Sequence, residues 1–242
     1  MSERESDVRG AARRVKLILF GATGMVGQGA LLECLDDPEV ARVLAVVRRP
    51  TGRTHDKLDE LVVSDFGDYA AVEERLRGYD ACLFCLGVSA AGMKEEEYRH
   101  VTYDFTLAAA KTLARLNPGL TFCYVSGAGT DSTEKGWQMW ARVKGKTEND
   151  LLALPLGAAY MFRPGFIQPA RGVVSSISWY RAIYAATGWM YPALSRVFPK
   201  SLMTSATLGR ALIAAAKHGA PKRVLEAADV NALVSRGSPG AA

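Results

Sequence analysis

A glycine-rich turn near the start of the chain constrains its fold most strongly. The apolar run Val15–Phe20 leads directly into Gly21-Ala22-Thr23-Gly24-Met25-Val26-Gly27, and a helical pattern from Gln28 to Leu35 follows. A strand, a glycine turn and a helix in this order bring backbone N–H groups to a helix N-terminus, where a phosphate group can approach because no side chain blocks it. The feature predicts a pyrophosphate site at the turn; the alternative is a tight turn that binds no ligand.

Short apolar runs alternate with longer helical patterns along most of the chain. One helix face is predicted from Tyr98 to Thr112, and a second helix runs from about Gly136 to Leu154. Because strands that alternate with helices form right-handed βαβ units, the pattern predicts an α/β fold with a doubly wound parallel sheet of Rossmann type. The predicted strands are Lys16–Phe20, Arg42–Val47, Glu60–Ser64, Asp80–Leu86, Thr121–Val125 and Ala158–Phe162, with an edge strand at Arg223–Leu225.

The alternation of strand and helix patterns stops after Pro164, and this divides the 242 residues into regions. We expect a loose tail over 1–14, a nucleotide-binding core over 15–169, a small helical substrate or lid region over 170–234 packed on that core, and a loose tail over 235–242. A helix capped by Thr204 or Ser205 is expected to end near Lys217. The whole is predicted to be a single domain.

Composition excludes several classes of protein. The chain is 49% hydrophobic with a net charge of +5, so it is neither disordered nor strongly basic, and no nucleic acid partner is expected. The longest run without charges, Leu17–Leu32, is too short and too rich in glycine to span a membrane. The first residues lack a secretory signal, which predicts a cytoplasmic location. Cys82 and Cys85 are read as buried packing residues rather than a redox pair.

Residues that follow the other strands indicate which dinucleotide would bind. The position 21 residues after Gly27 is Arg48, followed by Arg49, where an acid would be expected if the ligand had a free ribose 2′-hydroxyl. Arginine at this place favours a 2′-phosphate, which predicts NADP(H) over NAD(H); the alternative is a solvated arginine pair. Further cofactor contacts are predicted at the ends of the third and fourth strands, by Asp65 with Phe66 and by Leu86 with Gly87, although Asp65 could equally cap a helix.

Together these motifs resemble an atypical short-chain dehydrogenase/reductase, similar to the Tat-interactive oxidoreductase-like and NAD-dependent epimerase-like proteins. The resemblance covers about 15–169 and continues through Val125-Ser126, Val143-Lys144-Gly145 and Phe162-Arg163-Pro164-Gly165. It implies a cofactor contact at Pro164 and a small-molecule substrate over the nicotinamide. It also implies that Ser126 binds the substrate oxygen, while Lys144 holds the nicotinamide ribose.

The chain departs from this family at one position. The catalytic tyrosine that the resemblance implies, four residues before Lys144, is Trp140. Indole donates a hydrogen bond but is no acid near neutral pH. Two interpretations therefore stay open: a reductase of apolar carbonyl or hydroxyl compounds with altered proton delivery, or an NADP(H)-binding regulatory or scaffold protein without turnover.

An aromatic segment over 172–198 has three possible roles. It could line an apolar substrate pocket, contact a membrane surface peripherally, or form a packed lid or dimer surface. No metal site is predicted, because His55, His100 and His218 are dispersed without ligand spacing. No oligomeric state is predicted.

Overall fold

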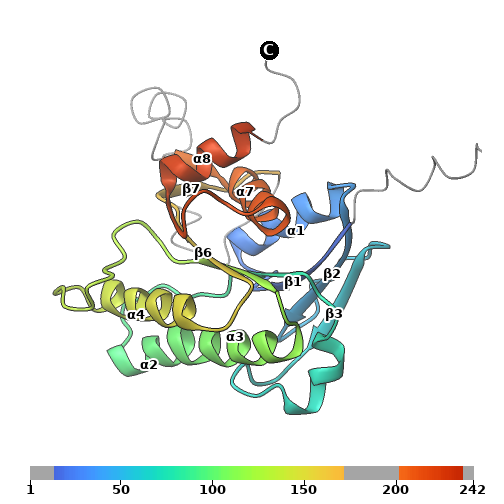
Figure 1. Cartoon of the computed structure of the whole chain (residues 1–242). Coiled ribbons are helices and arrows are strands. Elements are labelled where there is room, and N and C mark those ends of the chain that lie inside the picture. The colour runs from blue at the N-terminus through green and yellow to red at the C-terminus, as the bar shows by residue number, and fades with distance from the viewer. Residues whose placement is uncertain (1–13, 172–201, 237–242) are drawn as a thin grey trace, which may run out of the picture.

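A computed structural model of the chain describes residues 14–171 and 202–236 (Figure 1). Seven parallel strands form one sheet in the order β3-β2-β1-β4-β5-β6-β9. This arrangement confirms the predicted Rossmann-type sheet. The strands are β1 (Val15–Phe20), β2 (Val40–Val47), β3 (Leu58–Val62), β4 (Ala81–Phe84), β5 (Thr121–Val125), β6 (Ala158–Arg163) and β9 (Val224–Glu226).

Helices cover both faces of the sheet, as Figure 1 shows. On one face α1 (Met25–Asp36), α7 (Ser205–His218) and α8 (Ala227–Arg236) pack on an apolar layer that includes Leu17, Leu31 and Leu212. On the other face α3 (Phe105–Leu116) and α4 (Met139–Ala153) pack on a layer that includes Ile18 and Leu113. Successive residues of β1 therefore serve opposite layers, which is why this strand is apolar throughout.

Close helix packing joins the C-terminal region to the glycine-turn unit. A Cβ at Gly29 of α1 would lie 2.7 Å from Cβ of Ser205, and one at Gly209 of α7 would lie 2.9 Å from Cα of Ala30. Glycine at both places lets the backbones of α1 and α7 approach each other. Helix α7 thus completes the core of the sheet rather than forming a separate unit.

Several boundaries differ from the predicted ones. Glu60–Ser64 was placed two residues late relative to β3, and the helix predicted from Tyr98 is divided. A short helix α2 (Glu95–Arg99) passes through a π-helical turn, η2 (His100–Asp104), before α3 begins. A 3₁₀ turn, η1 (Ala70–Leu76), precedes β4.

A second, two-stranded parallel sheet was not predicted. It pairs β7 (Phe166–Gln168) with β8 (Leu202–Thr204). Each strand has three residues, which is too short for an alternating pattern to be recognised. The aromatic segment 172–198 lies outside the described residues.

Candidate functional site

Each of the strands β1 to β6 is followed by a residue of the predicted site. Because parallel strands end at the same edge of a sheet, the residues share the carboxyl edge. In sheet order this edge carries Asp65 after β3, Arg48 after β2, Gly21 after β1, Gly87 after β4, Ser126 after β5 and Pro164 after β6. The strand order reverses between β1 and β4, and a doubly wound sheet binds its ligand at that crevice.

Two of the loop glycines are required by the fold itself. Gly21 has φ +79°, and a Cβ there would lie 2.6 Å from the carbonyl carbon of Cys85. A Cβ on Gly27 would overlap the carbonyl oxygen of Gly21. A Cβ on Gly24 would make only an ordinary contact, 3.4 Å from the Gly21 oxygen. Packing therefore does not require glycine at position 24, unlike positions 21 and 27.

The loop leaves the N-terminus of α1 open to an anion. Gly24 is the N-cap residue, and no side chain accepts the hydrogen bonds of the first turn. Its N–H donates to the Gly21 carbonyl over 2.9 Å, and Gln28 Nε2 donates to the Thr23 carbonyl over 2.7 Å. These bonds fix the turn, while the first-turn N–H groups, including those of Met25 and Val26, have no partner within the helix. The helix dipole adds a favourable field for phosphate at the same point.

We expect Gly27→Ala to lower the free energy of unfolding by at least ~1–3 kcal/mol, because the new methyl group would overlap a backbone carbonyl that cannot move away freely. Urea denaturation followed by circular dichroism measures the change. Gly24→Ala is the matched control, and its stability should stay within about 1 kcal/mol of the parent. Equal losses in the two variants would contradict the packing assigned to Gly27.

The two arginines after β2 form no ion pair with a described residue. Arg48 and Arg49 are exposed, and neither pairs with an acid in the part of the chain that the structure describes. The nearby Arg42, by contrast, pairs with Asp59. The absence of an internal partner leaves both guanidinium groups available to a ligand.

The predicted contacts after β3 and β4 differ in what they can offer. Asp65 is exposed and accepts a hydrogen bond from the Gly67 N–H over 2.7 Å, so one carboxylate oxygen closes a turn. The ring of Phe66 is buried edge-on against Phe20, which leaves only its backbone for a ligand. A Cβ on Gly87, which follows the half-buried Leu86, would meet open space.

Ser126 does not direct its hydroxyl proton toward the open edge. Ser126 is 8% exposed, and its Oγ lies 2.5 Å from Oε1 of Glu148 and 3.1 Å from the Phe162 carbonyl oxygen, both of which accept from the hydroxyl. Glu148, itself 1% exposed, receives Nη2 of Arg163 at 2.5 Å and Nε at 3.1 Å. Arg163 also donates to Ser132 and to Glu226. The serine is thus part of a buried hydrogen-bonded ion pair that joins β5, α4 and β6.

Lys144 lies beside this network. Its Nζ donates to the backbone carbonyl of Ser126 over 2.7 Å and stands 5.9 Å from the ring of Tyr124. Burial lowers the pKa of Lys144 to about 8, against the opposing field of Glu148. Burial raises the pKa of Tyr124, so this phenol stays neutral. Lys144 is therefore a half-buried amine with a lowered pKa at the carboxyl edge.

Trp140 and Pro164 complete the edge. The indole of Trp140 is half-buried and reaches toward the loop after β5, with Cη2 3.4 Å from where a Cβ on Gly129 would lie. The carbonyl of Pro164 accepts a hydrogen bond from the N–H of Ala128 over 2.9 Å. That bond holds the two loops together, and it leaves the Pro164 ring as the contact that this residue could make with a ligand.

Sequence reasoning missed Glu148 as a member of the site. The available signal was an acid on the buried face of a helix, four residues after Lys144, where a charge needs a partner. Its partner, Arg163, belongs to the Phe162-Arg163-Pro164-Gly165 motif, which gives no sign of an ion pair. No sequence rule connects them, because they are brought together by the packing of α4 on β6.

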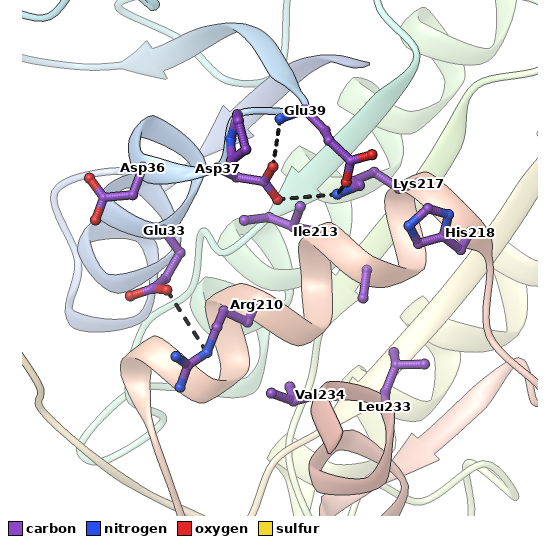
Figure 2. A pocket seen from close by; sticks show the side chains of 12 residues that line it. Glu33, Asp36, Asp37, Glu39, Arg210, Ile213, Lys217, His218, Leu233 and Val234 are labelled. Carbon is purple, nitrogen blue, oxygen red and sulfur yellow. Dashed lines mark hydrogen bonds and ion pairs between the residues drawn. The ribbon is translucent and has the colours of Figure 1, made fainter. Parts of the chain in front are cut away.

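A separate cavity of about 460 Å³ lies at the other end of α1 (Figure 2). Figure 2 shows two pairs of opposite charge: Lys217 lies between Asp37 and Glu39, and Arg210 faces Glu33, whereas Asp36 points away from them. Apolar side chains such as Ile213 and Leu233 form the rest of the wall. Since α1 is 12 residues long, roughly 18 Å separate this cavity from the glycine turn. It lies away from the carboxyl edge of the sheet, so it does not form part of the site.

Within residues 14–171 and 202–236, no group of acidic, histidine and cysteine side chains could hold a metal ion. None of the helices in these same ranges is long and apolar enough to cross a membrane.

Comparison with known protein families finds no matching family model. Among curated proteins, the chain is similar to leucinostatins biosynthesis cluster protein T of Purpureocillium lilacinum, with 26% identity over 57% of this chain and 51% of that protein. It is also similar to the mitochondrial protein FMP52 of Debaryomyces hansenii, with 29% identity over 66% of this chain and 71% of that protein. FMP52 of Meyerozyma guilliermondii matches at 27% identity over 63% of this chain and 65% of that protein. The chain thus spans about half to two thirds of the length of the first relatives it matches.

Solved structures share the fold. The Bordetella bronchiseptica enzyme WbmF, in complex with NAD+, superimposes with a TM-score of 0.66 and 14% identity, covering 93% of this chain and 78% of that one. Uronate dehydrogenase from Agrobacterium tumefaciens gives a TM-score of 0.63 at 14% identity, covering 90% and 77%. The FMP52 relatives are named mitochondrial, so they give no support to the cytoplasmic location predicted from the sequence.

Proposed function

We propose that the protein is an NADP(H)-dependent oxidoreductase. The chain has the NAD(P)-binding Rossmann fold of the epimerase-like, atypical short-chain dehydrogenases/reductases, and its homologues include FMP52 proteins. Its substrate would be a small apolar carbonyl or hydroxyl compound. The observation that carries the proposal is the uncapped N-terminus of α1, with unpaired Arg48 and Arg49 at the end of the next strand. A bound NADPH would supply hydride at this edge.

The roles of the chain's own residues follow from their places. The turn at Gly24 would bind the diphosphate, and Arg48 or Arg49 the 2′-phosphate. Lys144 has two N–H groups left after its bond to Ser126, and these can reach a ribose hydroxyl or the substrate oxygen. Asp65, through its second carboxylate oxygen, would accept from the adenine amino group.

Replacing both Arg48 and Arg49 with alanine is expected to weaken NADPH binding about 10- to 100-fold and to leave NADH binding nearly unchanged. One charge-assisted hydrogen bond contributes roughly 1.5–3 kcal/mol, which corresponds to that range. Titration of cofactor fluorescence at fixed salt measures both dissociation constants.

Arg77→Ala is the matched control, because Arg77 is also exposed but precedes β4 at the opposite edge of the sheet. It should leave both affinities unchanged. Equal or tighter binding of NADH than NADPH by the parent protein would refute the proposed preference. Failure to bind either dinucleotide would refute the function.

A second candidate function is a cofactor-binding protein without turnover. It is favoured by Trp140 in place of an acid and by the Ser126 hydroxyl, whose proton is committed to Glu148. NADPH absorbance followed with a panel of aldehydes, ketones and quinones discriminates the two. Tight binding without consumption of NADPH by any member of the panel would favour the second function.

A further inference from the structure

We propose that Lys144 itself carries the proton to and from the substrate oxygen, in place of the phenol that is absent at position 140. The inference rests on the proposed oxidoreductase function and assigns the acid that this function requires.

The geometry gives Lys144 the necessary freedom. One of its three N–H groups is bound to the Ser126 carbonyl at 2.7 Å, and this bond fixes Nζ at the end of β5. The remaining two N–H groups have no other acceptor among the described residues. An ammonium group that is anchored by one bond and free at two can donate to an oxygen placed beside it.

The neighbouring polar groups are less suited to the same task. The hydroxyl proton of Ser126 is given to Glu148, so Oγ offers lone pairs to the edge and not a proton. For Glu148 to accept a proton, it would have to give up its bidentate bonds to Arg163 in a buried place. Trp140 supplies no acid at all. Among these groups beside Ser126 in the described part of the chain, Lys144 is the one that can change its protonation without breaking an ion pair.

The surroundings also adjust Lys144 for proton transfer. The groups that face it are Glu148 on its own helix, Tyr124 on β5 and the Ser126 carbonyl. Tyr124 is neutral, and the charge of Glu148 is shared with Arg163. Desolvation therefore dominates and brings the pKa of Lys144 to about 8, near the pH at which a general acid works best.

The proposed step balances as follows. Bound NADPH would supply hydride to the carbonyl carbon, and the electron pair of the C=O π bond would move to the oxygen. That oxygen takes a proton from Nζ of Lys144, whose N–H bond breaks and whose electron pair stays on nitrogen. The neutral amine then regains a proton from water. Reduction therefore needs protonated Lys144, and alcohol oxidation needs the neutral amine.

The test compares the parent protein with Lys144→Arg and Lys144→Gln, using NADPH and 4-nitrobenzaldehyde between pH 6 and 10. In the parent, kcat/KM for reduction should be constant at low pH and fall tenfold per unit above the pKa of Lys144, which lies at about 8 in the free protein. Lys144→Arg keeps the charge but does not release a proton. It should lose about 10²–10⁴-fold in kcat while binding NADPH within a few fold of the parent. Lys144→Gln, which is smaller and neutral, repeats the kcat test if arginine disturbs the fold.

A second readout uses the protein without cofactor. Competitive acetylation with acetic anhydride, read peptide by peptide in a mass spectrometer, should show Lys144 reaching half of its full reactivity near pH 8, with exposed Lys111 as the reagent reference. A kcat for Lys144→Arg within about threefold of the parent would overturn the inference and leave the oxidoreductase function standing. If the parent binds NADPH but oxidises it with none of the carbonyl compounds tested, both the inference about Lys144 and the oxidoreductase function are overturned.

Discussion

Trp140→Tyr is expected to raise kcat for carbonyl reduction by up to ~10²-fold. The position is four residues before Lys144 on α4, so a phenol there would lie on the same helix face as the amine. A well-placed general acid contributes about 10²–10⁴-fold, and the lower end applies because Lys144 already supplies a proton. The tyrosine ring is smaller than the indole, whose edge now lies over Gly129, so the fold should accept it. NADPH consumption with 4-nitrobenzaldehyde measures the change.

Trp140→Phe is the matched control, because phenylalanine has the size of tyrosine without its hydroxyl. If both variants gain equally, the extra space at Gly129 and not the acid explains the gain. If neither gains, the missing phenol does not limit the rate, and the pH profile of the parent then decides between proton supply by Lys144 and the second candidate function. A shift of the pH profile in Trp140→Tyr alone would show that the phenol has entered the proton path.

The fold could be predicted from the sequence because its signals are local. The apolar runs of β1, β2 and β5 stand out against polar surroundings, and the glycine turn after Phe20 fixes the order of strand and helix. Parallel strands then bring their carboxyl ends to one edge, so the places of Arg48, Gly87 and Ser126 follow from topology alone.

The chemistry of the site could not be predicted in the same way. Ser126 and Arg163 are 37 positions apart, and the direction of the serine hydroxyl depends on an acid that α4 brings between them. The lowered pKa of Lys144 depends on burial that no local pattern records. Three-residue strands such as β7 and β8 also form only because the rest of the fold places them side by side.

Glu148→Ala is expected to be the most destabilising of these substitutions. It would leave Arg163, whose side chain is 12% exposed, without the acid that takes two of its hydrogen bonds, and it would leave the Ser126 hydroxyl with the Phe162 carbonyl as its remaining acceptor. Removing one partner of a buried ion pair costs about 3–5 kcal/mol. For a chain of this size that lowers the melting temperature by roughly 6–20 °C. Urea and thermal denaturation measure both quantities.

The matched control is Glu226→Gln, which removes the other acid that Arg163 contacts. That side chain is 54% exposed, so its loss should cost less than about 1 kcal/mol. The double variant Glu148→Leu with Arg163→Met removes both buried charges, and it should recover much of the stability lost in Glu148→Ala because no unpaired charge remains. A double variant as unstable as the single one would mean that the lost volume and not the unpaired guanidinium causes the damage. Recovery would separate the structural role of the ion pair from the proton step at Lys144. That step should persist in the double variant with its pH profile moved to lower pH, because the field of Glu148, which raises the pKa of Lys144, is gone.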